Sequence, residues 1–423
     1  MSKSSLIFVS LDGLACSALG PYGCSWLETP GLDRLAGAGV VYDRFIAQSM
    51  DRSVVLSRFI RHSGSTSDPS LARLAKDAGF LTLLVTDSGS LAQSSLVREF
   101  DECHLLQVDA ISPPAIASSL EETRFGRLIA AALSRLEALG EQPYFLWIHS
   151  SFLLEHWDAP LELRYQEDLA ELLGESSESP PPEAEEFSFE ETLESCAACL
   201  DEAAQGRIRD AQFSTVPPQL DWVGDLEPDV MLAWMTAYGA QVQLLDAVLD
   251  TLNAGYLAPR SHSTGLVLVS TSGFALGERD TLGPDSGEPS GSLLQLPLIM
   301  VHPRCSPIRS LRPVGSDSLA ATLVDLLGLP ETMQDPEPHR SLLEELRPEQ
   351  WAEPLEEMTP AISTDVATSS SGRVAITTPK WFYWASSDGE ENLYLKPDDR
   401  FEVNDVAKLR TDVTAEFREL ADS

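Results

Sequence analysis

Short apolar runs alternate with helix-like segments through the first part of the chain. The runs at residues 6–11 (LIFVSL), 81–85 (LTLLV) and 144–148 (YFLWI) are typical of strands buried on both faces. Residues 29–39 place a threonine before a proline and end at a glycine, which predicts a capped helix. Residues 124–140 have the apolar spacing of an amphipathic helix. Strands separated by helices of this length predict βαβ units and a mainly parallel sheet.

The pattern resumes near the middle of the chain. Residues 228–255 have the apolar stripe of a long helix, residues 265–269 and 293–303 have the pattern of strands, and residues 316–329 have that of a further helix. Residues 373–397 alternate like antiparallel strands around the turn SDGE, and a closing helix follows.

Two segments interrupt this order and suggest the domain boundaries. Glu, Ser and Pro dominate residues 174–191, which predicts a solvated loop within an acidic insertion at about 166–220. A Ser/Thr-rich stretch predicts a linker over residues 357–372. We therefore expect an α/β domain over residues 1–356 and a C-terminal subdomain over 373–423.

The charge of the chain limits its partners. The 423 residues include 66 acidic and 29 basic side chains, which gives a formal net charge of −37. Such a surface repels phosphates and disfavours nucleic acid and anionic membranes as partners. No apolar stretch approaches the ~20 residues of a membrane helix. The apolar run Leu6–Val9 is shorter than a secretory signal requires, so we expect a cytoplasmic protein.

The six cysteines do not predict a zinc or redox site. Cys196 and Cys199 form one CxxC motif, and no second motif completes a zinc site. The motif lies in an acidic, helix-like segment, where negative neighbours raise a thiol pKa. These thiols are therefore expected to be incidental.

The strand at residues 265–269 ends in the small polar residues Ser270, Thr271 and Ser272. The carboxyl ends of parallel strands are where α/β enzymes place their chemistry. This one supplies no carboxylate, histidine or lysine. It is either a polar loop or an active-site edge whose reactive groups have been replaced.

Several segments, taken in order, resemble the sulfatases of the alkaline-phosphatase superfamily. The segment SLIFVSLDGLACSALGPYG, followed by ETPGLDRLAGAGVVYDRFIAQS, resembles their N-terminal signature. The blocks PYFLWIHS, LVLVSTSGFALGE, LQLPLIMVHP and ENLYLKPDDRFEVNDVAKL follow in the family order. The resemblance covers almost the whole chain apart from the acidic insertion. It implies a large α/β domain with a central mixed sheet flanked by helices, a small C-terminal α+β subdomain, and sulfuric ester hydrolysis.

The resemblance also implies a set of site residues. The family uses a divalent cation held by several carboxylates and a formylglycine nucleophile made from Cys or Ser. It also uses Arg, Lys and His around the sulfate. Calcium takes about six to eight oxygen ligands, and a sulfuryl group in transfer requires cations aimed at its oxygens.

Most of the implied metal ligands are replaced in this chain. Where the family has two adjacent aspartates after its first strand, this sequence has Asp12 and Gly13. Where the family has Asp-His after a later strand, it has Thr271 and Ser272. Asp12 is either a metal ligand or a turn aspartate. One carboxylate would hold calcium or magnesium poorly.

The implied nucleophile is replaced as well. The block Cys-x-Pro-Ser-Arg aligns with residues 54–58, so Val54 takes the cysteine position. Residues 50–61 contain no cysteine, and Ser53 is the nearby hydroxyl that could stand in. Arg58 is a candidate anion-binding residue, or alternatively a structural one.

The remaining catalytic positions also differ from the family. Leu154 stands at the histidine position, and Pro284 stands at about the lysine position. His149 lies on the strand itself, whereas His156 follows the expected position and could be displaced into it. Glu278 matches a family residue that often serves the scaffold.

These replacements favour a catalytically degenerate sulfatase-like protein with no resident cofactor. It would bind or scaffold an unknown protein or small-molecule ligand. The first alternative is an active sulfuric or phosphoric ester hydrolase that uses calcium or magnesium with Asp12, Ser53, His156 and Glu278. The second is a structural protein that docks through the acidic loop 174–194.

Overall fold

The computed structural model describes most of the two predicted domains. The described residues are 3–61, 69–106, 115–140, 142–164, 202–218, 227–284, 287–330, 340–346, 360–364 and 372–421. The acidic loop 174–194 and the Cys196–Cys199 motif lie outside these ranges.

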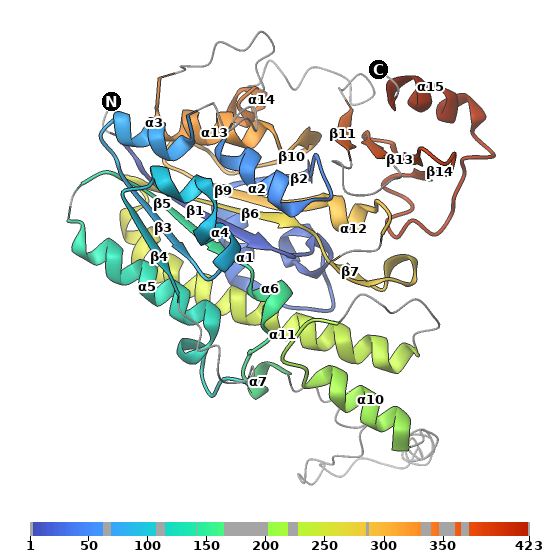
Figure 1. Ribbon diagram of the computed structural model, residues 1–423, viewed down its shortest axis with the longest axis horizontal. Coiled ribbons are helices and arrows are strands. Elements are labelled where there is room, and N and C mark those ends of the chain that lie inside the picture. The colour runs from blue at the N-terminus through green and yellow to red at the C-terminus, as the bar shows by residue number, and fades with distance from the viewer. Residues whose placement is uncertain are drawn as a thin grey trace, which may run out of the picture.

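An eight-stranded sheet forms the centre of the molecule (Figure 1). Its strand order is β10-β2-β9-β6-β1-β5-β3-β4. The strands are β1 (Ser5–Asp12), β2 (Val40–Ile46), β3 (Leu81–Thr86), β4 (Glu102–Leu105), β5 (Tyr144–Ser150), β6 (Thr264–Ser272), β9 (Gln295–Val301) and β10 (Ile308–Gly315). Strand β9 runs antiparallel to β2 and β6, whereas the other pairings are parallel. The expected mixed, mainly parallel sheet is confirmed.

Helices cover both faces of this sheet, as Figure 1 shows. One core contains residues of α1 (Pro30–Ala38), α5 (Arg124–Ala138) and α11 (Pro228–Leu252), and the other contains residues of α2 (Arg52–Ile60), α3 (Leu71–Asp77) and α13 (Ser318–Leu327). Successive residues of β1 point to opposite faces, so Ile7 packs in the first core and Phe8 in the second. The continuous apolar run of β1 therefore reflects burial on both sides.

The C-terminal subdomain is an antiparallel sheet covered by a helix. Its strand order is β11-β12-β13-β14, and the strands are β11 (Ala361–Thr364), β12 (Arg373–Thr377), β13 (Trp381–Ser386) and β14 (Glu391–Leu395). The closing helix α15 (Thr411–Ala421) packs on this sheet through Phe417. The expected subdomain with antiparallel strands and a closing helix is observed.

Strand β11 lies within the linker that the sequence predicts over residues 357–372. It pairs with β12 along its whole length, and the Ser363 hydroxyl donates to the Ala47 carbonyl at 2.5 Å. The prediction is therefore wrong for residues 361–364, because this pairing depends on a partner strand and not on local composition.

Helix α10 (Glu202–Gln212) lies within the predicted acidic insertion and packs against α11. Their contact contains Ile208 and Ala211 from α10, with Val230 and Ala233 from α11. No helix in the described part of the chain combines the length and the apolar character that crossing a bilayer requires.

Arg164 ties the start of the insertion to its end. Its side chain is fully buried, and burial lowers the pKa of the guanidinium to about 10, which leaves it charged at neutral pH. It donates to the carbonyls of Trp157 at 2.6 Å, Ala159 at 2.9 Å, Gln212 at 3.2 Å and Ser214 at 2.8 Å. One side chain thus satisfies carbonyls on both sides of residues 165–201.

We predict that Arg164→Met destabilises this region. The substitution keeps the apolar stem but leaves buried carbonyls without donors, which should lower the free energy of unfolding by about 3 kcal/mol. Urea unfolding and limited proteolysis near residues 202–218 would measure the effect. Arg73→Met, on an exposed helix face, is the matched control and should change little. Equal effects of the two substitutions would contradict the prediction.

Candidate functional site

The predicted metal-ligand positions Asp12 and Thr271 lie on the adjacent strands β1 and β6, and β5 lies on the other side of β1. These strands are parallel, so their carboxyl ends meet at one edge of the sheet. Asp12 ends β1, Ser151 directly follows β5, and Thr271 lies near the end of β6. The fold therefore brings the predicted metal-ligand positions together.

Both carboxylate oxygens of Asp12 already accept hydrogen bonds. Oδ2 accepts from the Ser151 hydroxyl at 2.9 Å, and Oδ1 accepts from the Thr271 hydroxyl. Asp12 is only 5% exposed, and the half-exposed Arg52 places its Nε 3.9 Å from Oδ2. Donors from the neighbouring strand ends thus stabilise this buried charge.

His149 is buried on β5 beside Asp12. Its Nδ1 lies 2.9 Å from the Ser10 hydroxyl oxygen, which also accepts a hydrogen bond from Trp147 Nε1 at 2.8 Å. Its Nε2 lies 3.7 Å from Asp12 Oδ2, beyond normal hydrogen-bond distance. His149 is therefore a packed residue of the strand, as the sequence suggests.

Gly13 and Leu154 lie at two positions where this sequence differs from the family pattern. The Leu154 side chain limits which residue fits at position 13. Gly13 has a φ of +82°, in the left-handed region that favours glycine. A Cβ added at this position would lie 2.3 Å from Leu154 Cδ2. Leu154 lies on the short helix α6 (Phe152–Glu155) and is half-buried. Its side chain thus occupies the space that any side chain at position 13 would enter.

The hydroxyls at the end of β6 join this strand to the loop after β1. Ser272 Oγ accepts from the Gly13 amide at 3.1 Å, and Ser270 Oγ accepts from the Leu14 amide at 3.1 Å. The pairing of β1 with β6 is irregular here: Leu11 lies opposite Ser270, but Asp12 lies opposite Ser272. The small polar residues after β6 therefore have a structural role at this edge.

The residues around the predicted nucleophile position lie on helix α2, and the side chains of Ser53 and Arg58 donate hydrogen bonds to residues just before that helix. Val54 lies half-buried in the first turn of α2. The exposed Ser53 donates its hydroxyl to Asp51 Oδ1 at 2.7 Å, at the N-cap of the helix. Arg58, the candidate anion-binding residue, donates to Gln48 Oε1 at 2.7 Å.

The predicted lysine region lies against the C-terminal subdomain. Arg279 is held by Glu288 and by the Pro289 carbonyl, and its guanidinium lies 5.7 Å from the ring centre of Trp384. Glu278 Oε2 accepts from the Leu276 amide at 2.5 Å. Pro284 follows the short strand β8 (Leu282–Gly283), and no positively charged side chain replaces the lysine there.

A buried ion pair next to Asp12 is not evident from the sequence pattern. Asp87, which follows β3, accepts from Arg124 Nε at 3.0 Å, from the Ser150 hydroxyl at 2.7 Å and from the Ser151 amide at 3.0 Å. Arg124 also donates to Glu155 at 3.1 Å. The signal available in the sequence was an aspartate directly after a buried strand, in VTD. This network positions the loop that carries Ser151 and Leu154.

His156 lies within the influence of this network. Burial and the positive charge of Arg124 lower the pKa of its imidazole, and Asp87 opposes them. A leaving-group acid must carry its proton at the working pH. The lowered pKa favours the neutral form of His156 at neutral pH.

The donor set at this edge does not fit calcium or magnesium. Among the described residues, no group of three or more His, Cys, Asp or Glu side chains is arranged to hold a metal ion. Asp12 is the one carboxylate of the predicted set, and both its oxygens are engaged by hydroxyls. A calcium site needs several oxygen ligands free to turn toward the ion.

We predict that Gly13→Ala is destabilising in a way that depends on Leu154. The positive φ and the contact with Leu154 together should cost about 2 kcal/mol of unfolding free energy. In a Leu154→Ala background the contact is removed, so the cost should fall to that of the backbone conformation. Gly389→Ala, at φ +89° in open space, measures this backbone cost alone. A double-mutant cycle by urea unfolding that shows strict additivity would contradict the coupling.

We also predict that His156 titrates below the ordinary histidine pKa of 6.5. An NMR pH titration measures the midpoint, and His156→Gln identifies the resonance. Because the unfolded chain binds this proton at higher pH, the contribution of His156 to stability is present above pH 6.5. It is lost as the pH falls through the lowered pKa. A midpoint at or above 6.5 would show that Arg124 and burial do not control this residue.

The chain is similar to solved structures but not to any family model or curated protein. No protein-family model matches the chain, and no curated protein matches it. The structure of BT4656 in complex with its substrate D-glucosamine-2-N,6-O-disulfate aligns over 100% of this chain and 96% of its own, with a TM-score of 0.70 and 16% identity. The phosphonate monoester hydrolase of Agrobacterium radiobacter aligns over 99% and 94%, with a TM-score of 0.68 and 16% identity. BT1596, a 2-O GAG sulfatase, aligns over 100% and 91%, with a TM-score of 0.66 and 14% identity. The chain therefore has the fold shared by sulfatases and phosphonate monoester hydrolases.

Proposed function

We propose that this chain is a degenerate member of the sulfatase family that does not hydrolyse sulfate esters and acts by binding or scaffolding. The family assignment is supported by the order of the sequence blocks and by a fold that aligns with solved sulfatases over nearly their full length. The loss of hydrolysis is a separate proposal and depends on the residues at the edge of the sheet.

The arrangement around Asp12 carries this proposal. In the family, metal-binding residues stand at this edge, whereas here the hydroxyls of Ser151 and Thr271 donate to the single carboxylate. Because a hydroxyl proton occupies each oxygen, the carboxylate is stable without a cation. A cation would have to displace these donors and would gain no second carboxylate at Gly13.

The covalent route lacks its nucleophile. The side chain of Val54, at the family position, offers only carbon atoms, and a nucleophilic mechanism needs a side-chain oxygen, sulfur or nitrogen that can attack. The Ser53 hydroxyl is directed to Asp51 at the helix cap. The neutral form of His156 is a poor source of the proton for a leaving oxygen.

We accordingly propose a protein without a resident cofactor. Its partner would be another protein or a small molecule, and the strongly negative charge argues against nucleic acid and anionic membranes. A metal-dependent hydrolase with non-standard residues remains the alternative that the following experiment separates from this proposal.

The purified chain should contain no stoichiometric calcium or magnesium by elemental analysis. It should also leave an aryl sulfate, an aryl phosphate and an aryl phosphonate monoester intact when either metal is added. The variant Asp12→Ala serves as the matched control, and its background should equal that of the unaltered chain. Metal-dependent turnover that Asp12→Ala abolishes would overturn the proposal and establish an ester hydrolase.

A further inference from the structure

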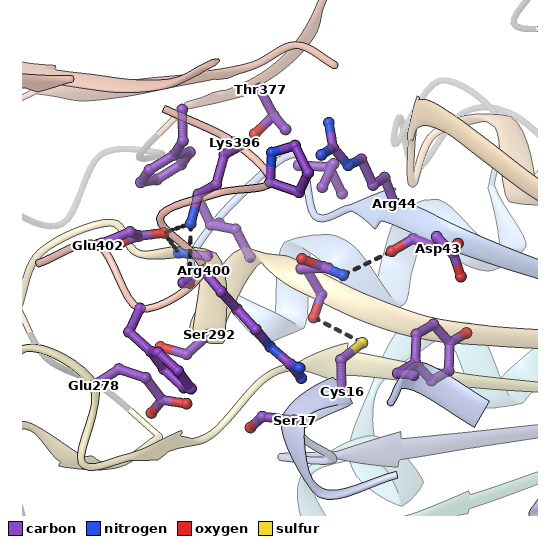
Figure 2. Close-up of a pocket in the computed structure, with 18 of the residues that line it drawn as sticks. Cys16, Ser17, Asp43, Arg44, Glu278, Ser292, Thr377, Lys396, Arg400 and Glu402 are labelled. Carbon is purple, nitrogen blue, oxygen red and sulfur yellow. Dashed lines mark hydrogen bonds and ion pairs between the residues drawn. The ribbon is translucent and has the colours of Figure 1, made fainter. Parts of the chain in front are cut away.

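A pocket lies between the main domain and the C-terminal subdomain and is lined by residues of both. Its volume is about 440 Å³, within the range of small-molecule sites. Figure 2 shows residues of both parts around it, including Cys16 and Ser17 from the loop after β1 and Lys396, Arg400 and Glu402 from the subdomain. A second pocket of about 600 Å³ shares part of this lining: Ser17, Glu278, Arg400, Phe401 and Glu402. Asp12, Val54, Leu154, Thr271 and Ser272 line neither pocket.

Half of the charged residues that line the first pocket form ion pairs. Asp43 pairs with Arg309 at 2.6 Å, and Glu402 pairs with Lys396 at 3.0 Å. Arg44 donates to the carbonyls of Thr378 and Pro379, at 2.9 and 2.7 Å, and Asp43 partly compensates its charge. With the two pairs set aside, the lining carries the cations Arg44 and Arg400 against the single acid Glu278. With Arg309 counted beside the lining, the local formal charge is four cations against three acids, although the chain as a whole is strongly negative.

Arg400 is the cation that a ligand can reach. Figure 2 shows its side chain extending from the subdomain across the pocket toward Cys16 and Ser17. No hydrogen bond or ion pair joins its guanidinium to another residue in the part of the chain that the structure describes. Burial raises the pKa of the Cys16 thiol, and the positive charge of Arg400 opposes that rise. The positive charge of Arg400 thus acts on Cys16, on the opposite side of the pocket lining.

Two buried polar atoms beside Arg400 also lack partners within the described residues. They are the Ser17 hydroxyl oxygen, which can donate to an oxyanion, and Glu402 Oε2, an acceptor that an oxyanion does not satisfy. A buried polar group without a partner costs about 1–3 kcal/mol, so such groups call for an explanation. Glu402 is 5% exposed and has a φ of +58°, a backbone conformation that concentrates at ligand sites. Strain and unsatisfied polar groups therefore coincide in the lining of one pocket.

Apolar side chains form the remaining walls. The pocket is lined by the aromatic and aliphatic residues Tyr22, Ile46, Leu294, Pro379, Phe382 and Phe401. A flat apolar group would pack against these side chains, and an oxyanion on the same molecule would meet Arg400. Ligand sites commonly combine mostly apolar walls with a few converging polar groups.

We propose that this interdomain pocket binds a small molecule that carries an oxyanion and a flat apolar body. The oxyanion pairs with the Arg400 guanidinium and accepts a hydrogen bond from the Ser17 hydroxyl, while the apolar body lies against Phe382 and Phe401. The inference rests on the proposed function, because it names the site and the ligand class of a protein that binds without hydrolysing.

Ligand-observed NMR titration of the full chain with benzoate, phenyl phosphate and phenyl sulfate tests this site. At least one of the three should bind with a dissociation constant of about 1 mM or tighter, and benzyl alcohol, which lacks the charge, should not. Which probe binds best distinguishes a carboxylate, a phosphate and a sulfate as the natural group. Arg400→Ala should weaken binding at least ~10-fold, because a charge-assisted pair is removed. Arg400→Lys, which keeps the charge but loses the forked donors, should weaken it less.

Arg73→Ala, which removes an exposed arginine on α3, is the matched control and should leave binding unchanged. Thermal unfolding of Arg400→Ala should stay close to that of the unaltered chain, because among the described residues the guanidinium loses only its contact with the Phe401 ring, 5.9 Å from the ring centre. Failure of all three probes to bind, or equal binding by Arg400→Ala, would overturn the inference. Benzoate contains no ester, so its binding is measured apart from hydrolysis. Turnover of a sulfate ester would refute the proposed function without deciding the role of the pocket.

Discussion

The buried carboxylate of Asp12 is the constraint around which the edge of the central sheet is built. A carboxylate that is 5% exposed needs donors, because an isolated buried charge is expensive. Ser151 after β5 and Thr271 on β6 supply them, so the strands on both sides of β1 contribute to one hydrogen-bonded unit. Asp87 fixes the same loop through the Ser150 hydroxyl and the Ser151 amide. The polar residues at these strand ends thus hold the edge together through hydrogen bonds to one another.

The contact between Gly13 and Leu154 makes the replacements interdependent. A side chain at position 13 would meet Leu154, and the positive φ of Gly13 adds a backbone cost to any such change. A second aspartate, at position 13, would therefore require a smaller residue at 154 and a different local backbone. Thr271 would also have to release Oδ1 of Asp12 before a cation could use it. A single substitution toward the family pattern would have to overcome several of these local preferences at once, so they stabilise the edge in its present form.

The sequence allowed several strands of a mixed, mainly parallel sheet to be anticipated where burial leaves a local signal. β1 and β5 are continuous apolar runs, and Pro30 with Gly39 delimits α1. The sequence did not reveal β11, whose residues Ala361–Thr364 become a strand through pairing with β12 and resemble a linker in composition. The positions of Asp12 and Thr271 followed from the resemblance. No local pattern predicts the distances behind three features of the site. These are the hydrogen bond between Asp12 and Thr271, the Asp87–Arg124 ion pair, and the lack of space for a side chain at position 13.

The net charge of the chain and the charge inside one pocket affect different kinds of ligand. A net charge of −37 disfavours polyanions, because they sample the potential of a whole surface. A small molecule in an enclosed pocket experiences mainly the groups that line it, since surface charges beyond about 10 Å are screened at 0.1 M salt. In the pocket beside the C-terminal subdomain the pairs Asp43–Arg309 and Lys396–Glu402 cancel, and Arg44 and Arg400 remain against Glu278. An acidic protein can therefore present a positive binding site, and the subdomain that supplies Arg400 would be the part of the fold that defines it.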